Sequence, residues 1–379
     1  MKKFLTGLLL LAAVFGMAWL FFYESPAEKN FKKNQAAAQR GDVNAQRRLA
    51  GLYLNGEGVK PSTDAALDLY TKAAAAGDAQ SAYELAELYI AGKKVPQDFA
   101  AAVTYLKAAA GNGGAQAQYE LGRFYKEGLA ELKPNPAQAA FWWMQAEGAG
   151  SAEAASALQD VQLETPDVYT RVKELFTAYQ RALRGETEDQ LFLAQAYRKG
   201  DLLEPDLETA VYWYDKAQTG KLPQAWYELG ELYETGEGVT QDKAKALELY
   251  TQAADAGYVP AEYQLGKEAY MQAAASDKPD FSVAFGWLKR AADAGNADAQ
   301  YMLGILYMQG RGTEQSVPQA ISSFRRAAEQ GHADAQYVLG QSYYKGLGVT
   351  ANRTAAKKWL QLSADNGNAS AKQFLEQIK

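Results

Sequence analysis

The chain has 379 residues, a net charge of −6 and a hydrophobic fraction of 48%. This length fits two or three globular domains or one long repeat array, and the apolar content suffices for a large core. The acidic balance disfavours nucleic-acid binding, which normally requires an excess of basic residues. The chain has no cysteine and a single histidine, His332, so disulfides, thiolate metal sites and histidine-rich metal centres are excluded. We therefore expect no metal site and no cofactor.

An uncharged, mostly apolar run extends from Phe4 to Tyr23, preceded by Lys2 and Lys3. Residues 4–23 are about as many as a helix needs to cross the lipid bilayer. We expect residues 1–23 to be an uncleaved signal anchor, and a cleaved signal peptide followed by secretion is the alternative. The two lysines favour a cytoplasmic N-terminus. The rest of the chain would then lie in the periplasm, anchored to a bacterial inner membrane.

The remaining sequence repeats every 36 residues. One leucine marks the copies: Leu49, Leu85, Leu121, Leu193, Leu229, Leu265, Leu303, Leu339 and Leu375. The interval of 72 residues between Leu121 and Leu193 predicts one degenerate copy near Leu158. Two extra residues fall between Leu265 and Leu303. Such a period is typical of helical repeat arrays.

Each marked leucine predicts a first helix, which we call helix A. In most copies an alanine stands four residues before the leucine and a tyrosine four residues after it, as in Ala45, Leu49 and Tyr53. This spacing puts the three side chains on one helical stripe. Glycine pairs such as Gly56 and Gly58 then end helix A. Because these pairs follow a helix and recur along the array, we interpret them as turns and not as phosphate-binding loops.

A second helix, which we call helix B, follows the turn. Aromatic residues mark its centre: Tyr70, Tyr105, Trp142, Trp143, Tyr179, Trp213, Tyr214, Tyr250, Trp287, Phe324 and Trp359. Small residues such as Ala73 and Ala74 come shortly after the aromatic, and a glycine such as Gly77 ends the helix. Large rings that face small side chains are what interlocking hairpins need. We therefore interpret the aromatics as core and not as a ligand cage.

The register predicts an all-α solenoid of about nine antiparallel helical hairpins behind one transmembrane helix. Its parts are the anchor (1–23), a linker with an N-terminal capping helix (24–41), repeats 1–3 (42–150), a degenerate repeat 4 (151–185), repeats 5–9 (186–367) and a C-terminal capping helix (368–379). Repeat 4 has Val161 in place of the tyrosine and is interrupted by Pro166. It is either a joint between two arms or a drifted copy. Repeat 7 lacks the glycine turn, which predicts an altered link over Met271–Pro279.

The pattern A-x-x-x-L-G-x-x-Y-x-x-G-x-G-V, followed by an aromatic, K-A-A and a final glycine, resembles the Sel1-like repeat, a tetratricopeptide-like family. The match is good in four segments: Ala45–Gly77, Ala225–Gly257, Ala299–Gly331 and Ala335–Gly367. The resemblance covers residues 27–379. It implies an α-solenoid that scaffolds protein complexes, often in bacterial envelopes or in signalling. It also implies that helix A lines the inner surface of the array.

We expect the variable positions of helix A to contact a partner protein. They are Glu84, Glu87, Glu120, Arg123, Glu228, Glu231, Met302, Ile305 and Met308. The acidic positions favour a basic segment of the partner, and the three apolar ones favour a hydrophobic anchor. A solvated charged face with a few apolar residues is the alternative.

An enzyme is not expected, and neither is a small-molecule substrate. Ser/His/Asp catalysis would depend on His332, which falls in a turn between repeats. The spacing of Glu228, Glu231 and Glu234 also fits an ordinary polar helix face. Cysteine-rich relatives have been proposed to act on β-lactams, but this chain lacks their cysteine framework. The expected function is a membrane-anchored interaction scaffold. A carbohydrate-binding scaffold for polysaccharide export and an immunity-type protein that neutralises a secreted toxin are the alternatives.

Overall fold

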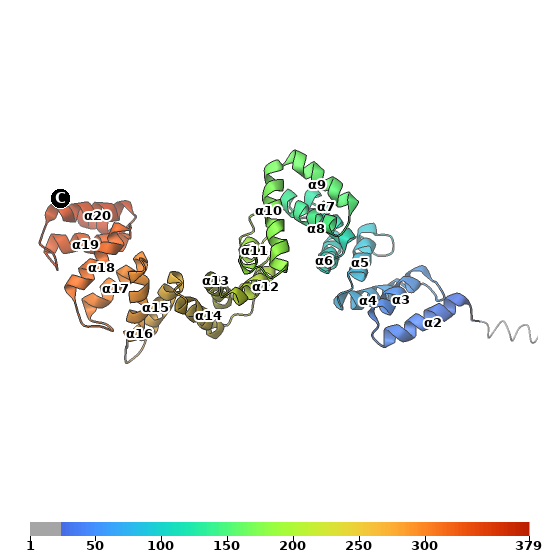
Figure 1. Cartoon of the computed structure of the whole chain (residues 1–379), viewed down its shortest axis with the longest axis horizontal. Helices are drawn as coiled ribbons and strands as arrows, with labels where there is room; N and C mark the ends of the chain where they lie inside the picture. The colour runs from blue at the N-terminus through green and yellow to red at the C-terminus, as the bar shows by residue number, and fades with distance from the viewer. Residues whose placement is uncertain (1–23, 379) are drawn as a thin grey trace, which may run out of the picture. The chain divides into compact units, whose positions relative to one another are not determined.

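The computed structural model describes residues 24–378, where all regular secondary structure is helical (Figure 1). The all-α solenoid prediction is confirmed. The expected anchor, residues 1–23, lies outside the described residues. Within the range 24–378, no helix is both long and apolar enough to span a bilayer. The chain divides into two compact units: Met1–Thr177 with Leu202–Glu204, and Ala178–Asp201 with Pro205–Lys379.

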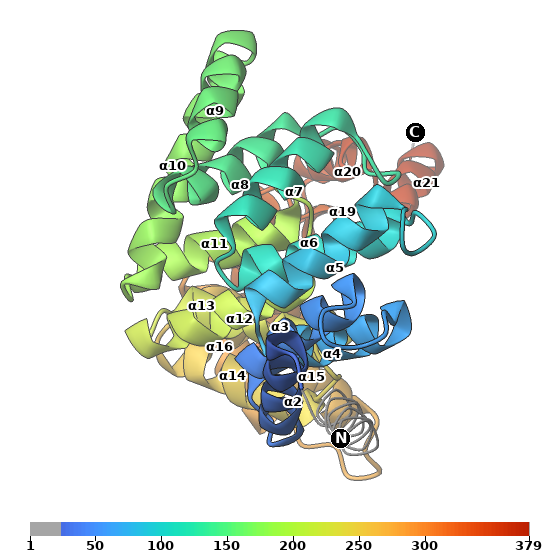
Figure 2. The ribbon, with the colours of Figure 1, turned by 90° about the vertical axis from the view of Figure 1, so that its right-hand side faces the viewer.

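The described part of the first unit, from residue 24 on, has one lone helix followed by alternating A and B helices. These are α2 (Pro26–Gln39), α3 (Val43–Asn55), α4 (Thr63–Ala75), α5 (Ala79–Ala91), α6 (Phe99–Gly111), α7 (Ala115–Glu127), α8 (Pro136–Gly148), α9 (Ala152–Glu164) and the N-terminal part of α10 (Pro166–Leu183). Helix α2 lies beside α3 (Figure 1, Figure 2), and Phe31 and Ala38 share a buried cluster with Leu49.

The second unit continues the alternation and ends with a lone helix A. After the end of α10 it contains α11 (Thr187–Lys199), α12 (Leu207–Ala217), the 3₁₀ turn η1 (Gln218–Gly220), α13 (Pro223–Thr235), α14 (Lys243–Asp255), α15 (Val259–Ala274), α16 (Ser282–Asp293), α17 (Ala297–Gln309), α18 (Val317–Glu329), α19 (Ala333–Lys345), α20 (Arg353–Asp365) and α21 (Ala369–Gln377).

Short polar residues begin most of these helices, and glycines end most A helices. The Asp42 carboxylate accepts a 2.9 Å hydrogen bond from the backbone N–H of Ala45, which satisfies a donor at the start of α3. Gly56, with φ +74°, ends the same helix in the left-handed conformation. In α15 the equivalent position is Gln272, so the helix continues to Ala274 and has 16 residues instead of 13. The start of the altered link predicted at Met271–Pro279 is therefore helical.

Six of the eleven aromatic residues predicted to form the core of the B helices are buried, and the other five, Tyr105, Trp142, Tyr179, Trp287 and Trp359, are half-buried. Tyr214, Tyr250 and Phe324 are at most 2% exposed. The glycine after the repeat leucine lets helix B approach helix A closely. A Cβ on Gly122 of α7 would lie 2.4 Å from Nε1 of Trp143, whose indole N–H donates to the Tyr119 carbonyl. The Trp143 ring of helix B therefore packs directly against the backbone of helix A in this hairpin.

Repeat 4 keeps both of its helices although its motif is lost. Pro166 is the first residue of α10, where proline removes no intrahelical hydrogen bond. The prediction that Pro166 interrupts the repeat is therefore wrong, because this proline begins a helix. Val161 replaces the tyrosine and is fully buried.

Candidate functional site

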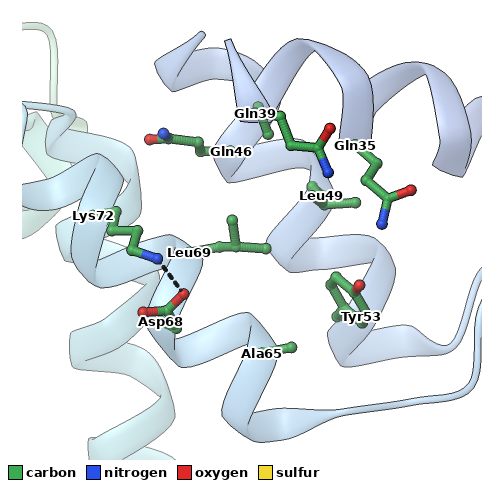
Figure 3. Close-up of a pocket in the computed structure, with 10 residues that line it drawn as sticks. Gln35, Gln39, Gln46, Leu49, Tyr53, Ala65, Asp68, Leu69 and Lys72 are labelled. Atoms are coloured by element: carbon green, nitrogen blue, oxygen red, sulfur yellow. Dashed lines mark hydrogen bonds and ion pairs between the residues drawn. The ribbon is translucent and has the colours of Figure 1, made fainter. Parts of the chain in front are cut away.

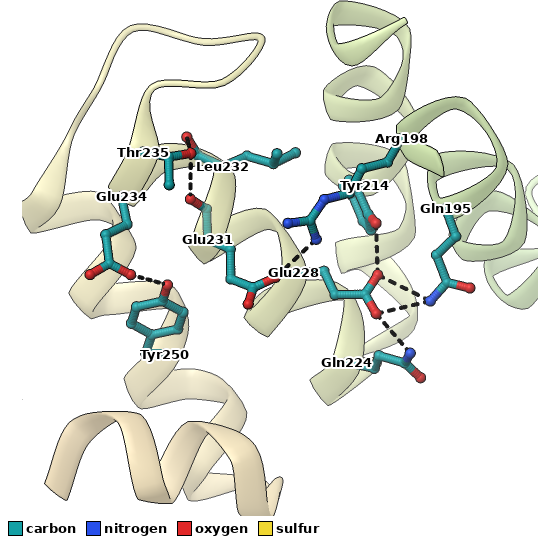
Figure 4. A network of polar contacts seen from close by, with 10 residues as sticks. All are labelled: Gln195, Arg198, Tyr214, Gln224, Glu228, Glu231, Leu232, Glu234, Thr235 and Tyr250. Carbon is teal, nitrogen blue, oxygen red and sulfur yellow. Dashed lines mark hydrogen bonds and ion pairs between the residues drawn. The ribbon is translucent and has the colours of Figure 1, made fainter. Parts of the chain in front are cut away.

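A polar network joins α11, α12 and α13 of the second unit, and Glu228 is at its centre (Figure 4). One carboxylate oxygen of Glu228 accepts from the Tyr214 hydroxyl at 2.7 Å. The other accepts from the Gln224 amide at 2.8 Å, and the Gln195 amide lies 3.0 Å from both oxygens. Glu228 is half-buried. Its acceptor capacity is largely used within the protein, so it links neighbouring repeats.

Glu231 and Glu234 continue the network along α13 (Figure 4). Arg198 Nη1 of α11 lies 2.9 Å from a carboxylate oxygen of Glu231, and the Tyr250 hydroxyl of α14 donates to Glu234 at 2.6 Å. Burial raises the pKa of Tyr227, Tyr214 and Tyr250 above the usual value, and the neighbouring glutamates raise it further. These phenols remain protonated donors at neutral pH.

In the first unit, the predicted acidic positions gather around a tyrosine. Burial raises the pKa of Tyr83 on α5, and Glu87 on the same helix and Glu120 on α7 raise it further. Glu120 pairs with Arg123 at 2.7 Å, whereas Glu84 accepts only from the Gln80 amide at 2.9 Å. Glu87 is exposed. Together, Tyr83, Glu84, Glu87, Glu120 and Arg123 form what we call the acidic A-helix surface.

Met302, Ile305 and Met308 of α17 are half-buried. They pack against a core cluster that includes Leu303 and Phe324. This placement gives the three side chains a packing role within their own repeats.

Sequence reasoning missed a row of tyrosines. A tyrosine stands two residues before the repeat leucine at Tyr83, Tyr119, Tyr227, Tyr263, Tyr301 and Tyr337. Tyr83 and Tyr227 each lie near a glutamate four residues later on the same helix, namely Glu87 and Glu231. The recurring tyrosine was the available signal, and its spacing of four residues from Glu87 and from Glu231 already places it beside them on the helix.

His332 is the N-cap of α19 and not a free surface residue of a turn. Its Nδ1 accepts from the backbone N–H of Ala335 at 3.2 Å, and its Nε2 lies 3.3 Å from Asp298. The ring stacks on Tyr301 with 4.6 Å between the ring centroids. Its side chain is only 14% exposed. Residues 24–378 contain no group of three or more histidine, aspartate or glutamate side chains that could hold a metal ion.

Comparison with curated proteins finds partial relatives. A Neisseria meningitidis serogroup B protein, named as uncharacterized, is 35% identical over 127 residues, covering 34% of this chain and 25% of that protein. A chitin synthase regulator of Saccharomyces cerevisiae is 35% identical over 161 residues, covering 41% of this chain and 23% of that protein. The chain therefore matches only about a quarter of the length of these relatives.

Among solved structures, a Sel1 repeat protein from Oxalobacter formigenes is 28% identical, with a TM-score of 0.49, covering 92% of this chain and 90% of that one. An immunity protein from Pseudomonas aeruginosa is 29% identical, with a TM-score of 0.33, covering 49% and 68%.

The Sel1 repeat model matches eight segments: 43–78, 79–114, 115–150, 187–217, 223–258, 259–296, 297–332 and 333–368. It passes over 151–186, where repeat 4 lies. Because these segments cover most of the sequence, the chain belongs to the Sel1 repeat family.

Proposed function

We propose that this protein is an interaction scaffold that binds a partner protein through the acidic A-helix surface. Sel1 repeat proteins generally mediate protein–protein interaction and are typically non-enzymatic scaffolds. The specific surface and the kind of partner are our proposal.

The observation that carries the proposal is the combination of Glu84, Glu87 and Tyr83 on one helix. Among the described residues no cation pairs with Glu84 or Glu87, and Glu87 is exposed. A basic segment would find two carboxylates that it can neutralise without breaking an existing ion pair. The Tyr83 ring beside them provides an apolar contact with a polar end. Binding of this kind weakens as salt screens the charges.

Glu228 and Glu231 are less suitable for a binding test because they hold neighbouring repeats together. Reversing their charge would disturb the fold and the surface at once. Glu84 and Glu87 separate these effects better, because neither accepts a hydrogen bond from another repeat, although the charge of Glu84 raises the pKa of Tyr70 on α4.

The test compares two charge-reversed versions of the full chain as bait in an envelope extract of the source organism. The double variant Glu84→Lys and Glu87→Lys should lose a partner that the native chain captures. The control, Glu147→Lys and Glu174→Lys, makes the same change in net charge at exposed positions of α8 and α10 and should retain it. Equal capture by both double variants would rule out the acidic A-helix surface.

We further propose that residues 4–23 anchor the scaffold in a bacterial inner membrane, with the repeats in the periplasm. Support comes from the length of the apolar run and from Lys2 and Lys3 before it. Protease added to spheroplasts should degrade the repeats. In a separate sample without protease, the chain should stay in the membrane fraction after alkaline carbonate washing. Release into the periplasmic fraction with a shortened N-terminus would instead establish a cleaved signal peptide.

A further inference from the structure

A pocket of about 420 Å³ lies between α2, α3 and α4 in the first unit (Figure 3). Gln35 and Gln39 line it from α2, and Gln46 lines it from α3. Leu69 faces them from α4, and an ion pair between Asp68 and Lys72 lies at the edge (Figure 3). The side chains of the three glutamines make no hydrogen bond to any described residue, so this pocket contains unused donors and acceptors.

Four other repeats have a glutamine at the position equivalent to Gln46, whereas three have Ala82, Trp226 or Glu262 there. In four A helices the glutamine three residues before the repeat leucine donates to a carbonyl in the last turn of the preceding helix. These bonds are Gln118 to Ala110 (3.1 Å), Gln190 to Ala182 (3.0 Å), Gln300 to Ala292 (3.1 Å) and Gln336 to Ala328 (3.0 Å). All four glutamines are buried. Gln46 occupies the same register, but it is half-buried and does not bond to the equivalent carbonyl, that of Ala38.

In two later repeats an arginine lies in the groove that is equivalent to this pocket and hydrogen-bonds to a backbone carbonyl there. Arg290 on α16 donates to the Ala254 carbonyl at 2.7 Å and pairs with Glu262 at 2.8 Å. Arg326 on α18 donates to the Ala292 carbonyl at 2.6 Å. Both arginines stand five residues before the glycine that follows their helix, and in α4 this position is Lys72.

Lys72 does not close the groove. Its ammonium pairs with Asp68 at 2.6 Å, one turn earlier on the same helix, and both side chains are 60% exposed. The Ala38 carbonyl consequently receives only backbone hydrogen bonds, from Arg40 and Gly41 just after the end of α2. Neither the glutamine nor the arginine contact of the other repeats is made here.

We propose that this pocket binds the guanidinium group of an arginine on a partner protein. The same groove holds the chain's own guanidinium in two other repeats, where a backbone carbonyl is the acceptor. Here the Ala38 carbonyl and the glutamine amide oxygens can accept from the five N–H groups of a guanidinium, and Asp68 supplies the opposite charge. The exposed Asp68–Lys72 pair is easily rearranged. Leu49 and Leu69 offer apolar contact to the aliphatic part of the arginine.

The site is independent of the acidic A-helix surface. It lies among α2, α3 and α4, whereas that surface is formed by α5 and α7. Either site can therefore fail its test without affecting the other.

The decisive variant is Lys72→Arg in the full chain. The chain's own guanidinium should then reach the Ala38 carbonyl, as Arg290 and Arg326 reach theirs, and occupy the pocket. The fold should be kept, with a thermal unfolding midpoint that is unchanged or higher. Lys243→Arg, at an exposed position of α14, is the matched control.

The probe is the peptide Ac-Gly-Arg-Gly-NH2. Its binding is measured by NMR, from the chemical shifts of the side-chain amides in a protein that is isotopically labelled at glutamine. Saturable shifts of the Gln35, Gln39 and Gln46 signals are expected, with each signal assigned from a glutamine-to-alanine variant. The equivalent citrulline peptide, which has the same shape without the charge, should bind at least about tenfold more weakly. Lys72→Arg should show a similar loss, and Lys243→Arg should show none.

Three results would overturn the proposal. Equal binding of the citrulline and arginine peptides would show that the pocket does not select a guanidinium. Unchanged peptide binding by a folded Lys72→Arg variant would place the binding elsewhere. Binding of free L-arginine as tightly as the peptide would indicate a small-molecule site rather than a docking site for a protein partner.

Discussion

The carboxylate of Glu228 on α13 accepts a 2.7 Å hydrogen bond from the hydroxyl of Tyr214 on α12. Tyr214 is fully buried, so this hydroxyl has no access to water as an alternative partner. Because the two helices belong to successive repeats, the bond helps to fix the position of one hairpin relative to the next. Glu228, which the sequence analysis placed on a partner-binding surface, therefore also stabilises the packing of successive repeats.

Replacing Glu228 with alanine should lower the free energy of unfolding of the second unit by about 1–3 kcal/mol, because the Tyr214 hydroxyl is left buried without an acceptor. Glu228→Gln retains an acceptor oxygen and should cost less. Urea denaturation followed by circular dichroism measures both. Glu237→Ala, at an exposed position after α13, is the control and should stay within about 0.5 kcal/mol of the native chain. A Glu228→Ala chain as stable as this control would show that the bond contributes nothing.

Gly122→Ala should destabilise the first unit by about 1–3 kcal/mol, since the added methyl group collides with the Trp143 ring and the ring cannot move without losing its bond to the Tyr119 carbonyl. Gly148→Ala is the matched control on the following helix. Its added methyl group meets no atom within 4 Å, so the change should be neutral or stabilise the helix by up to about 1 kcal/mol. Thermal unfolding of both variants gives the comparison. Equal thermal unfolding midpoints for the two variants would contradict the close packing of α8 against α7.

Alkaline pH should destabilise the protein through its buried tyrosines. Burial raises the pKa of Tyr70 to about 12 in the folded chain, and the pKa of Tyr83 and Tyr227 also rises. The unfolded chain releases these protons near pH 10, so stability is full below that pH and falls as the pH rises toward 12. Urea denaturation at about pH 8 and about pH 11 should show this loss, and Tyr70→Phe should reduce it. Equal stability of the native chain at both pH values would contradict the burial of these phenols.

The spacing of leucine, alanine and tyrosine predicted the helices because those positions repeat, and repetition is visible in one sequence. The role of Glu228 could not be predicted in this way. Its partners, Gln195 and Tyr214, lie on two other helices, and their contact depends on how successive hairpins stack. The same holds for the pocket beside α2, which is lined by three helices and in which Lys72 pairs with Asp68 instead of reaching a carbonyl.

One local prediction failed, and another was incomplete. Pro166 was predicted to interrupt repeat 4, but it is the first residue of α10, a position at which proline is favourable. His332 does lie in the turn between repeats, and the structure adds that its ring caps α19 and stacks on Tyr301. In both cases the residue type was interpreted without the exact helix boundary, which depends on capping contacts.

Contact between the acidic A-helix surface and a partner protein can be measured in cells. The most direct measurement places a photo-crosslinking amino acid at Glu87 of the full chain in cells of the source organism, with Thr104 on α6 as the control position. Both positions are exposed and belong to the first unit. The proposal predicts a cross-linked adduct to one protein from Glu87 and none from Thr104. An adduct from Thr104 alone, or equal adducts from both positions, would contradict it.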